Sequence, residues 1–221
     1  MHILETERLI LRRFTLGDLD RIYALVYADP VVRQAWSGVA GTPAEIKQRF
    51  ARKHILSADA FGLRAVALKE TGALIGLMGF QRHAPGEGQQ IYYLLSENEP
   101  DRRVGFDPSY LEAELTYALG RAFWKRGYAT EMGRAMVVYG FEQLGLGRII
   151  QGVRAENLNS VRLMQRLGFR LETGAHPGQV VGILDDYQHW RQATDALLGP
   201  ATSWAGGHQR EARPSGRASE T

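Results

Sequence analysis

The chain of 221 residues contains no cysteine. It therefore offers neither a disulfide framework nor a thiol nucleophile, and a zinc site would lack its sulfur ligands. The six histidines, at positions 2, 54, 83, 176, 189 and 208, are scattered without the spacing of metal ligands. We therefore expect no metal site and interpret these histidines as satisfied or exposed side chains.

The sequence also lacks a strong charge imbalance and any apolar run long enough to span a membrane. Its 27 Lys and Arg stand against 24 Asp and Glu, a formal net charge of +3. A nucleic-acid binder needs a clustered basic face with stacking aromatics, and only the run Arg121 to Arg126 approaches this. No signal peptide opens the chain, so we expect a soluble, cytoplasmic protein without nucleic-acid or membrane partners. Monomer and homodimer both remain open.

Length and composition indicate one globular domain. The chain is long enough for a sizeable core, and its 44% hydrophobic and 23% charged residues are ordinary values. Residues 199–221 have no periodicity and are rich in Gly, Ser, Ala and Arg. We predict a single domain over residues 1–198 and a disordered tail without a catalytic part.

The first half of the chain predicts a strand, two helices and a hairpin. Residues 8–14 alternate as a strand does, and Thr15 then begins a helix that ends near Asp29-Pro30. Thr42-Pro43 begins a second helix, through about Leu56. Two further runs, residues 61–69 and 73–81, flank Glu70-Thr71-Gly72 and predict a hairpin.

The stretch from Glu114 to Phe169 predicts a βαβ unit. An apolar run, Leu115 to Leu119, leads through a glycine turn into a helix whose apolar residues recur at i, i+3, i+4 and i+7. Gly145 ends this helix, and a second strand follows at Arg148 to Val153. Such crossovers place their two strands parallel. The last strand is expected at 179–184.

The glycine turn before this helix has the properties of a phosphate site. Helix starts leave N–H groups unpaired and carry partial positive charge. Gly127 and Ala129 would let an anion approach the backbone, and Lys125 and Arg126 add charge. Neither a nucleoside-triphosphate loop nor a Rossmann fingerprint is present. An ordinary turn with two solvated basic residues remains the alternative.

Three separated motifs resemble the GNAT superfamily of N-acetyltransferases. Trp124-Lys125-Arg126-Gly127-Tyr128-Ala129, followed by Thr130-Glu131, resembles its acetyl-CoA motif, Q/R-x-x-G-x-G/A. The Trp departs from that pattern but is similar to the RimJ/RimL-like branch of ribosomal-protein-alanine acetyltransferases. Asn157-Leu158-Asn159-Ser160 and Leu167-Gly168-Phe169 resemble later elements of that branch, and residues 5–12 its first strand. The resemblance covers roughly residues 4 to 191.

The resemblance implies an α/β fold and an activity. The expected fold is a single GNAT-like domain with a mixed sheet of about six to seven strands, split around the cofactor, and helices on both faces. The expected activity is transfer of acetyl from acetyl-CoA, a co-substrate, to a primary amine by direct attack in a ternary complex. The acceptor would be a protein N-terminus or a small amine. The opposing class is a non-catalytic acyl-CoA-binding or interaction protein on the same fold.

The resemblance also implies roles for individual residues. Ser160 would protonate or hydrogen-bond the departing thiolate, Glu114 would act as the base, and Asn157 would hold the cofactor or acceptor. Their alternatives are a helix cap, an exposed strand-end carboxylate and a turn former. Strand alternation places Glu114 and Tyr117 on opposite faces, so the two should not line one pocket unless a bulge intervenes. The residues expected to contact the cofactor are Tyr117, Ala118, Leu119, Lys125, Arg126, Gly127, Tyr128, Ala129, Thr130, Asn157 and Ser160.

Residues 82–112 depart from the resemblance, which has only a short link here. So long a segment without structure is uncommon unless it is functional or mobile. Its apolar run, Ile91 to Leu95, is consistent with an extra strand or a contact surface. Its acidic run, Glu97 to Asp101, would suit a cationic amine acceptor. A tolerated surface insertion and an acceptor-site or dimer role both remain open.

Overall fold

The computed structural model describes residues 2–36, 40–56, 61–82, 92–93, 103–104, 111–174, 176–198 and 203–204. Most of the insertion and of the tail expected from the sequence lies outside these residues. Within the insertion, β5 (Tyr92–Tyr93) pairs antiparallel with β6 (Arg103–Val104). Within the tail, β11 (Ser203–Trp204) pairs with β1 (His2–Glu5), a contact that the sequence did not predict.

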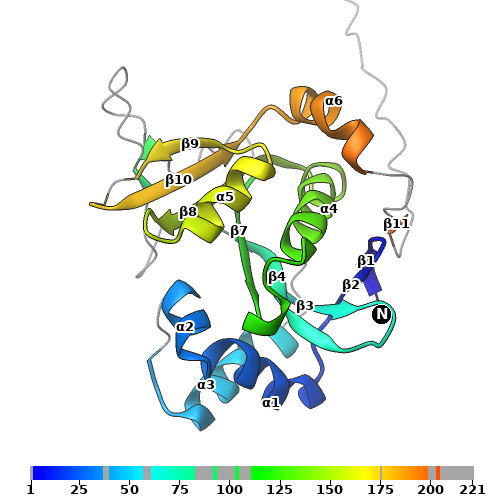
Figure 1. Ribbon diagram of the computed structural model, residues 1–221, viewed down its shortest axis with the longest axis vertical. Helices are drawn as coiled ribbons and strands as arrows, with labels where there is room; N and C mark the ends of the chain where they lie inside the picture. Colours follow the sequence, from blue (N-terminus) through cyan, green and yellow to red (C-terminus); the bar gives the residue numbers. More distant parts are fainter. Residues whose placement is uncertain are drawn as a thin grey trace, which may run out of the picture.

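Figure 1 shows the remaining strands and helices, coloured along the sequence. The strands are β2 (Leu9–Arg12), β3 (Gly62–Leu68), β4 (Leu74–Arg82), β7 (Leu111–Leu119), β8 (Leu146–Arg154), β9 (Arg170–Thr173) and β10 (Gln179–Leu184). The α-helices are α1 (Leu19–Ile22), α2 (Pro30–Trp36), α3 (Pro43–Phe50), α4 (Tyr128–Glu142), α5 (Leu158–Arg166) and α6 (Tyr187–Leu198). Shorter helical turns are η1 (Leu16–Asp18), η2 (Tyr23–Tyr27), η3 (Ala51–Ile55) and η4 (Arg121–Phe123).

The central sheet has nine strands in the order β11-β1-β2-β3-β4-β7-β8-β10-β9, more than the six to seven expected. All described neighbours in it are antiparallel except β7 and β8, which are parallel. The predicted βαβ unit and the predicted β3–β4 hairpin are confirmed. The additional strands include β1 and β11, two short strands at one edge of the sheet.

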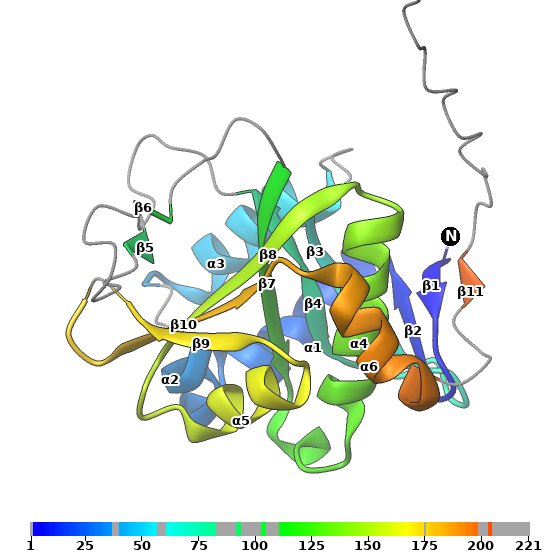
Figure 2. The same cartoon turned by 90° about the horizontal axis from the view of Figure 1, so that it is seen from above.

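Helices cover both faces of this sheet (Figure 2). On one face, α4, α5 and α6 pack Met132, Leu163 and Trp190 into the larger core. On the other, α1, η2 and α3 contribute Ile22, Val26 and Phe50 to a second core. Along β7, Ala113, Leu115 and Leu119 point into the larger core, and Ala118, on the opposite face, joins the second core.

The sheet is split between its two parallel strands. The pairing of β7 with β8 runs from Leu111 opposite Leu146 to Glu114 opposite Ile150 and then ends. On its other side, β7 stays paired with β4 from Ala113 to Leu119. The last five residues of β7 therefore have one free backbone edge, which faces the gap towards β8.

Among the described residues, no helix combines the length and the apolar character needed to cross a membrane.

Candidate active site

A left-handed turn connects β7 to α4. Gly127, the residue before α4, has φ 82°, and Lys125 has φ 58°. Positive φ is unfavourable for lysine, so the fold holds Lys125 in a strained conformation, as is frequent at functional sites. Trp124 fixes the start of the turn, because its Nε1 donates to the Leu119 carbonyl oxygen at 2.6 Å.

The turn leaves the N-terminus of α4 open. The first helical hydrogen bond joins the Glu131 N–H to the Gly127 carbonyl at 3.0 Å. The N–H groups of Tyr128, Ala129 and Thr130 precede it and therefore have no acceptor within the helix. These N–H groups and the helix dipole form a site that favours an anion.

A cavity of about 1110 Å³ lies against this helix start. Its lining comes from the first turn of the chain, β7, the glycine turn, α4 and α5. The lining residues used below are Thr6, Arg8, Ala35, Tyr117, Ala118, Leu119, Lys125, Gly127, Tyr128, Ala129, Thr130, Glu131, Arg134, Asn157, Asn159, Ser160, Arg162 and Arg166. Its size slightly exceeds the usual range of about 300 to 1,000 Å³ for small-molecule sites.

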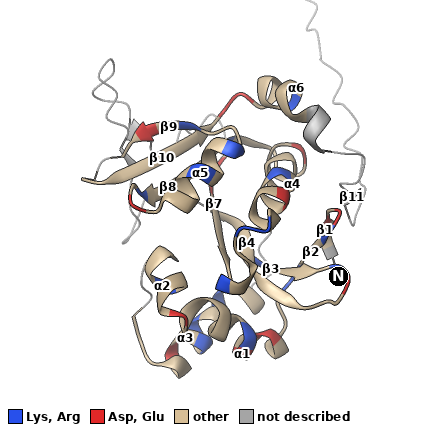
Figure 3. Ribbon diagram, in the orientation of Figure 1, with Lys and Arg blue, Asp and Glu red and all other residues tan. Residues whose placement is uncertain are grey.

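The lining of this first cavity is rich in cations. Five of its side chains are Arg or Lys, namely Arg8, Lys125, Arg134, Arg162 and Arg166. Figure 3 shows the basic residues on the turn before α4 and on α5. Arg134 Nε is buried and has no hydrogen-bond partner in the described part of the chain. A buried, unpaired donor in a cationic cavity fits a polyanionic cofactor, because such a donor is costly unless a ligand satisfies it.

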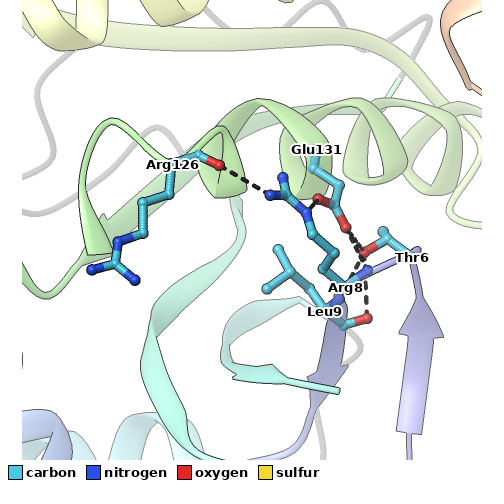
Figure 4. Close-up of polar contacts among 5 residues, drawn as sticks. All are labelled: Thr6, Arg8, Leu9, Arg126 and Glu131. Atoms are coloured by element: carbon cyan, nitrogen blue, oxygen red, sulfur yellow. Dashed lines mark hydrogen bonds and ion pairs between the residues drawn. The ribbon is translucent and has the colours of Figure 1, made fainter. Parts of the chain in front are cut away.

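A polar cluster braces the glycine turn from the beginning of the chain (Figure 4). Glu131 accepts hydrogen bonds from Thr6 Oγ1 at 2.6 Å and from Arg8 Nε at 2.6 Å. Arg8 also donates to the Arg126 carbonyl oxygen at 3.2 Å and covers the Tyr128 ring at 4.7 Å from its centroid. The cluster therefore holds the turn between the first two strands and α4, and Arg8 offsets the charge of Glu131 beside the anion site.

A second cavity, of about 640 Å³, opens on the other side of the split strand pair. The two cavities share four lining residues: Ala35, Tyr117, Asn157 and Ser160. A group held in the first cavity can therefore meet a group held in the second at these residues. This arrangement suits transfer between two substrates that enter from different sides.

Two hydroxyl groups meet at this junction. Burial raises the pKa of Tyr117, and the neighbouring Ser160 and Gln151 side chains lower it in part. Nevertheless, Tyr117 Oη and Gln151 Oε1 are buried and have no hydrogen-bond partner among the described residues. Buried polar atoms without partners are rare away from binding sites. The junction therefore offers polar atoms to a ligand.

Asn157 begins α5 and connects it to α2. Its Oδ1 accepts from the Ser160 N–H at 3.3 Å, and its Nδ2 donates to the Ala35 carbonyl at 3.3 Å. Asn157 is thus the helix cap, while Ser160 lies one turn inside α5. The alternative that Ser160 caps this helix is therefore wrong. Ser160 lines both cavities.

The structure brings together nearly all of the expected cofactor residues. Tyr117, Ala118, Leu119, Lys125, Gly127, Tyr128, Ala129, Thr130, Asn157 and Ser160 line the first cavity. Arg126 does not line it and contributes its carbonyl to Arg8 instead. Glu114 lines only the second cavity.

One expectation about the faces of β7 is wrong. Glu114 and Tyr117 both line the second cavity, although no bulge in the β4–β7 register separates them. The strand does alternate, but the second cavity reaches through the split in the sheet and is bordered by both faces of β7. Sequence alternation cannot reveal such an opening, because it depends on where β8 parts from β7.

The free edge of β7 presents backbone groups to the same gap. Gly120 N–H donates to the Ile75 carbonyl at 2.9 Å, so in this antiparallel pair Gly120 and Ala118 point their N–H groups towards β4. Tyr117 and Leu119 alternate with them and therefore point theirs towards β8. The N–H groups of Tyr117 and Leu119 therefore face the gap that opens where β8 parts from β7.

Several residues of the site had no assigned role at the level of sequence. Thr6 and Arg8 belong to the first-strand motif, but only the fold reveals their contact with Glu131, which lies more than a hundred residues away. Arg134 follows the glycine turn by seven positions, and its helical spacing could have suggested it. Among the described residues, no group of three or more His, Asp or Glu side chains is placed to hold a metal ion.

Comparisons with known proteins agree with this arrangement. Residues 8–170 match the family described as the acetyltransferase (GNAT) domain. The chain is 30% identical over 190 residues to the protein named uncharacterized N-acetyltransferase p20 of Bacillus licheniformis, covering 85% of this chain and 88% of that one.

Solved structures share the fold. An acetyltransferase (GNAT family) from Bacillus anthracis superposes with a TM-score of 0.63 at 21% identity, covering 85% of this chain and 99% of that one. A spermidine N-acetyltransferase from Vibrio cholerae, in complex with CoA and spermine, superposes with a TM-score of 0.55 at 20% identity, covering 79% and 92%.

The chain therefore belongs to the GNAT acetyltransferase family. It is an acyltransferase with a single α/β GNAT domain, and N-acetyltransferase is the activity that its family and relatives support.

Proposed function

We propose that this protein transfers an acetyl group from acetyl-CoA to a primary amine in a ternary complex. The observation that carries the proposal is the meeting of two cavities at Ser160 and Tyr117. One cavity has an open helix N-terminus and cationic walls, and the other offers room for an amine. We infer that the first holds acetyl-CoA and the second holds the acceptor.

The cofactor would be held by groups already in place. The N–H groups of Tyr128, Ala129 and Thr130 would receive the pyrophosphate, with Lys125 and Arg134 adding positive charge. The gap between β7 and β8 would receive the extended arm, alongside the free N–H groups of Tyr117 and Leu119. When bound, acetyl-CoA supplies an acetyl thioester, which is already activated towards attack by an amine.

The residues at the junction would orient the reactants and handle protons. Ser160 would donate a hydrogen bond or a proton to the sulfur of the departing thiolate. Tyr117 carries its proton at neutral pH, as tyrosine ordinarily does, and burial raises its pKa further, so it offers a second donor at the same place. The backbone N–H groups of β7 would stabilise the oxyanion of the tetrahedral intermediate.

Glu114 would deprotonate the acceptor amine, directly or through water. It lines the second cavity, on the side where the acceptor would lie. An α-amino group, with a pKa of about 8, needs little help from a base, whereas a lysine amine, with a pKa of about 10.4, needs more. Asn157 would hold the two sides of the junction together through its contacts with α5 and α2.

We place the protein in the RimJ/RimL-like branch, on the strength of Asn157 and Ser160 at their spacing and of Trp124 before the glycine turn. In that branch the acceptor would be a protein N-terminus, and a small amine is the alternative. A non-catalytic acyl-CoA binder would not need Ser160 directed into both cavities, so we favour an enzyme.

Release of free thiol from acetyl-CoA, measured with a panel of amines, tests this function. We expect amine-dependent release by the wild type. Ser160→Ala should lower kcat by about tenfold to a hundredfold with little change in acetyl-CoA affinity, because a thiolate is a fair leaving group even without a proton donor.

The matched variant Tyr117→Phe removes the other hydroxyl at the junction. We expect a smaller loss of kcat than for Ser160→Ala. The assignment of Ser160 as the donor would be contradicted by an unchanged kcat in Ser160→Ala. Absence of thiol release with every amine tested would contradict the proposed function itself.

A further inference from the structure

The second cavity carries more positive than negative charge. Arg49 of α3, Lys53 of η3 and Arg154 at the end of β8 all line it. Among the described residues of the lining, Glu114 is the single carboxylate. Three cations therefore converge on this cavity from three elements of the fold, the consecutive helical segments α3 and η3 and the strand β8.

These three cations are engaged only by neutral oxygen atoms. Arg49 donates to the Ala40 carbonyl at 2.7 Å, Lys53 donates to Gln81 Oε1 at 3.1 Å, and Arg154 donates to the Gln34 carbonyl. No carboxylate of a described residue forms an ion pair with any of them. Glu45, one turn before Arg49, accepts from the Thr42 N–H at 2.8 Å; it lies close enough to interact with the charge of Arg49 but forms no ion pair with it.

Several cations outside this second cavity form ion pairs with carboxylates. Arg12 pairs with Asp18 at 2.7 Å, Arg8 pairs with Glu131 at 2.6 Å, and Arg148 pairs with Glu112. His54, also in the lining, does not compensate the charge. Burial, together with Lys53 and Arg64, lowers its pKa to about 4, so it is neutral at physiological pH. The described wall of the cavity therefore carries an excess of positive charge.

We propose that the acceptor carries an anionic group, a carboxylate or phosphate, in addition to the amine that is acetylated. This inference rests on the proposed function and specifies its acceptor. The amine would lie at the junction, near Glu114 and Ser160, and the anionic group would lie near Arg49, Lys53 and Arg154. Charge complementarity of this kind favours one partner and rejects those of the opposite sign.

The same geometry disfavours polyamines as acceptors. A second or third ammonium group would lie against Arg49, Lys53 and Arg154, and like charges at such close range repel one another. The acidic run 97–101, which would suit a cationic acceptor, lies outside the described residues. A small amino acid and an acidic peptide N-terminus are the two sources of the proposed chemistry, and the cavity of about 640 Å³ has room for either.

A matched series of acceptors separates charge from size. The small series is γ-aminobutyrate, n-butylamine and diaminobutane, which share a carbon chain of the same length and differ in the group at its far end. The peptide series is Ala-Glu-Glu-Gly against Ala-Lys-Lys-Gly, which share the attacking α-amino group. We expect the anionic member of at least one series to exceed the cationic member at least about tenfold in kcat/KM, with the ratio falling as salt is added.

Binding provides a readout that does not depend on turnover. Calorimetry with the protein saturated with CoA, which has no acetyl group to transfer, gives the affinity for each acceptor directly. We expect the same order as in kcat/KM. The series that shows the preference identifies whether a small molecule or a peptide supplies the anionic group.

Lys53→Glu reverses one charge of the cavity and should abolish or invert the preference. Its matched control is Arg52→Glu, the neighbouring residue of η3, which is exposed and lines neither cavity. Both variants change the net charge equally, so only a local effect distinguishes them. We expect Arg52→Glu to keep the wild-type preference.

The outcomes separate the inference from the proposed function. Preferential acetylation or binding of diaminobutane and the lysine peptide would overturn the inference and leave the acetyltransferase intact. Equal affinities for anionic and cationic members of both series would also overturn it. Failure of thiol release with every acceptor would contradict the proposed function, while the binding order with CoA would still decide the charge of the acceptor.

Discussion

His54, a side chain that lines the second cavity, also contributes to the stability of the fold. It is 7% exposed, packs against the Phe50 ring at 4.9 Å between centroids, and accepts through Nδ1 from the Leu63 N–H at 3.3 Å. That hydrogen bond requires a neutral ring with its proton on Nε2. Burial, with Lys53 and Arg64 nearby, accordingly lowers the pKa of His54 to about 4.

We predict that the protein loses stability as the pH falls through the range between about 6.5 and about 4. In that range the unfolded chain binds a proton at His54 and the folded chain does not, so acid favours unfolding. The contribution of His54 would be about 3 kcal/mol at most. Urea unfolding at a series of pH values measures it.

The variant His54→Gln can still accept from the Leu63 N–H but does not titrate. We expect a shallower fall in its free energy of unfolding over the same pH range than in the wild type. The same slope in both proteins would show that other groups cause the acid sensitivity.

At the scale of residues, the sequence identified much of the site but not every role. Asn157 and Ser160 were recognised by their spacing, and both line the junction of the cavities. The sequence does not show which of the two is the helix cap. A cap and a residue three positions later are distinguished only by the backbone angles at which the helix begins. Arg126 was chosen for its charge, yet the turn directs its carbonyl, rather than its side chain, to Arg8.

At the scale of elements, the contacts of Thr6 and Arg8 with Glu131 connect the first two strands to α4. The guanidinium of Arg8 reaches Glu131 and the Arg126 carbonyl at once, a geometry that lysine cannot reproduce. Arg8→Lys therefore keeps the charge beside the cofactor site but loses the brace. We predict a decrease of about threefold to tenfold in acetyl-CoA affinity.

Thermal unfolding and calorimetry on the same Arg8→Lys protein separate the explanations. A small change in Tm with a clear loss of affinity would support positioning of the turn. Full retention of affinity would mean that Arg8 acts only through its positive charge. Glu131→Gln, which leaves Arg8 without its carboxylate partner, should weaken binding in the same direction.

Elements with strong local signals were predicted and others were missed. The Thr42–Glu45 capping box begins α3 as expected. The pair Asp29-Pro30 was interpreted only as the end of a helix, but Asp29 Oδ1 accepts from the Val31 and Val32 N–H groups and begins α2. Similarly, Asp186 Oδ1 accepts from the His189 N–H near the start of α6, where the sequence analysis predicted no helix. In both cases an aspartate close to the start of the helix accepts from its first N–H groups, and this local signal is already visible in the sequence.

At the scale of the whole molecule, the sequence predicts the fold class. It predicts the opening in the sheet only in part. The βαβ pattern predicted β7 and β8 as parallel neighbours, and they are. The point at which they separate, after Glu114, depends on packing between elements that are distant in the chain. The two joined cavities, the accessibility of both faces of β7 and the brace from Arg8 all result from that packing, so no local pattern revealed them.

The central claim is that the start of α4 binds the phosphates of acetyl-CoA. The measurement that tests it most directly is the calorimetric affinity for CoA of the wild type and of Ala129→Glu. The helix dipole favours a glutamate at the second position of a helix, which offsets part of the cost of enlarging Ala129, a partly buried side chain packed against the larger core. The same carboxylate would repel a phosphate at these N–H groups.

Two matched variants accompany Ala129→Glu. Ala129→Gln introduces a side chain of the same size without the charge. Ala44→Glu makes the same change at the same position of α3, an exposed site outside both cavities. We predict wild-type affinity for Ala44→Glu, a moderate loss for Ala129→Gln, and a loss of more than about tenfold, or about 1.4 kcal/mol, for Ala129→Glu. Equal CoA affinity in the wild type and in Ala129→Glu would contradict the account.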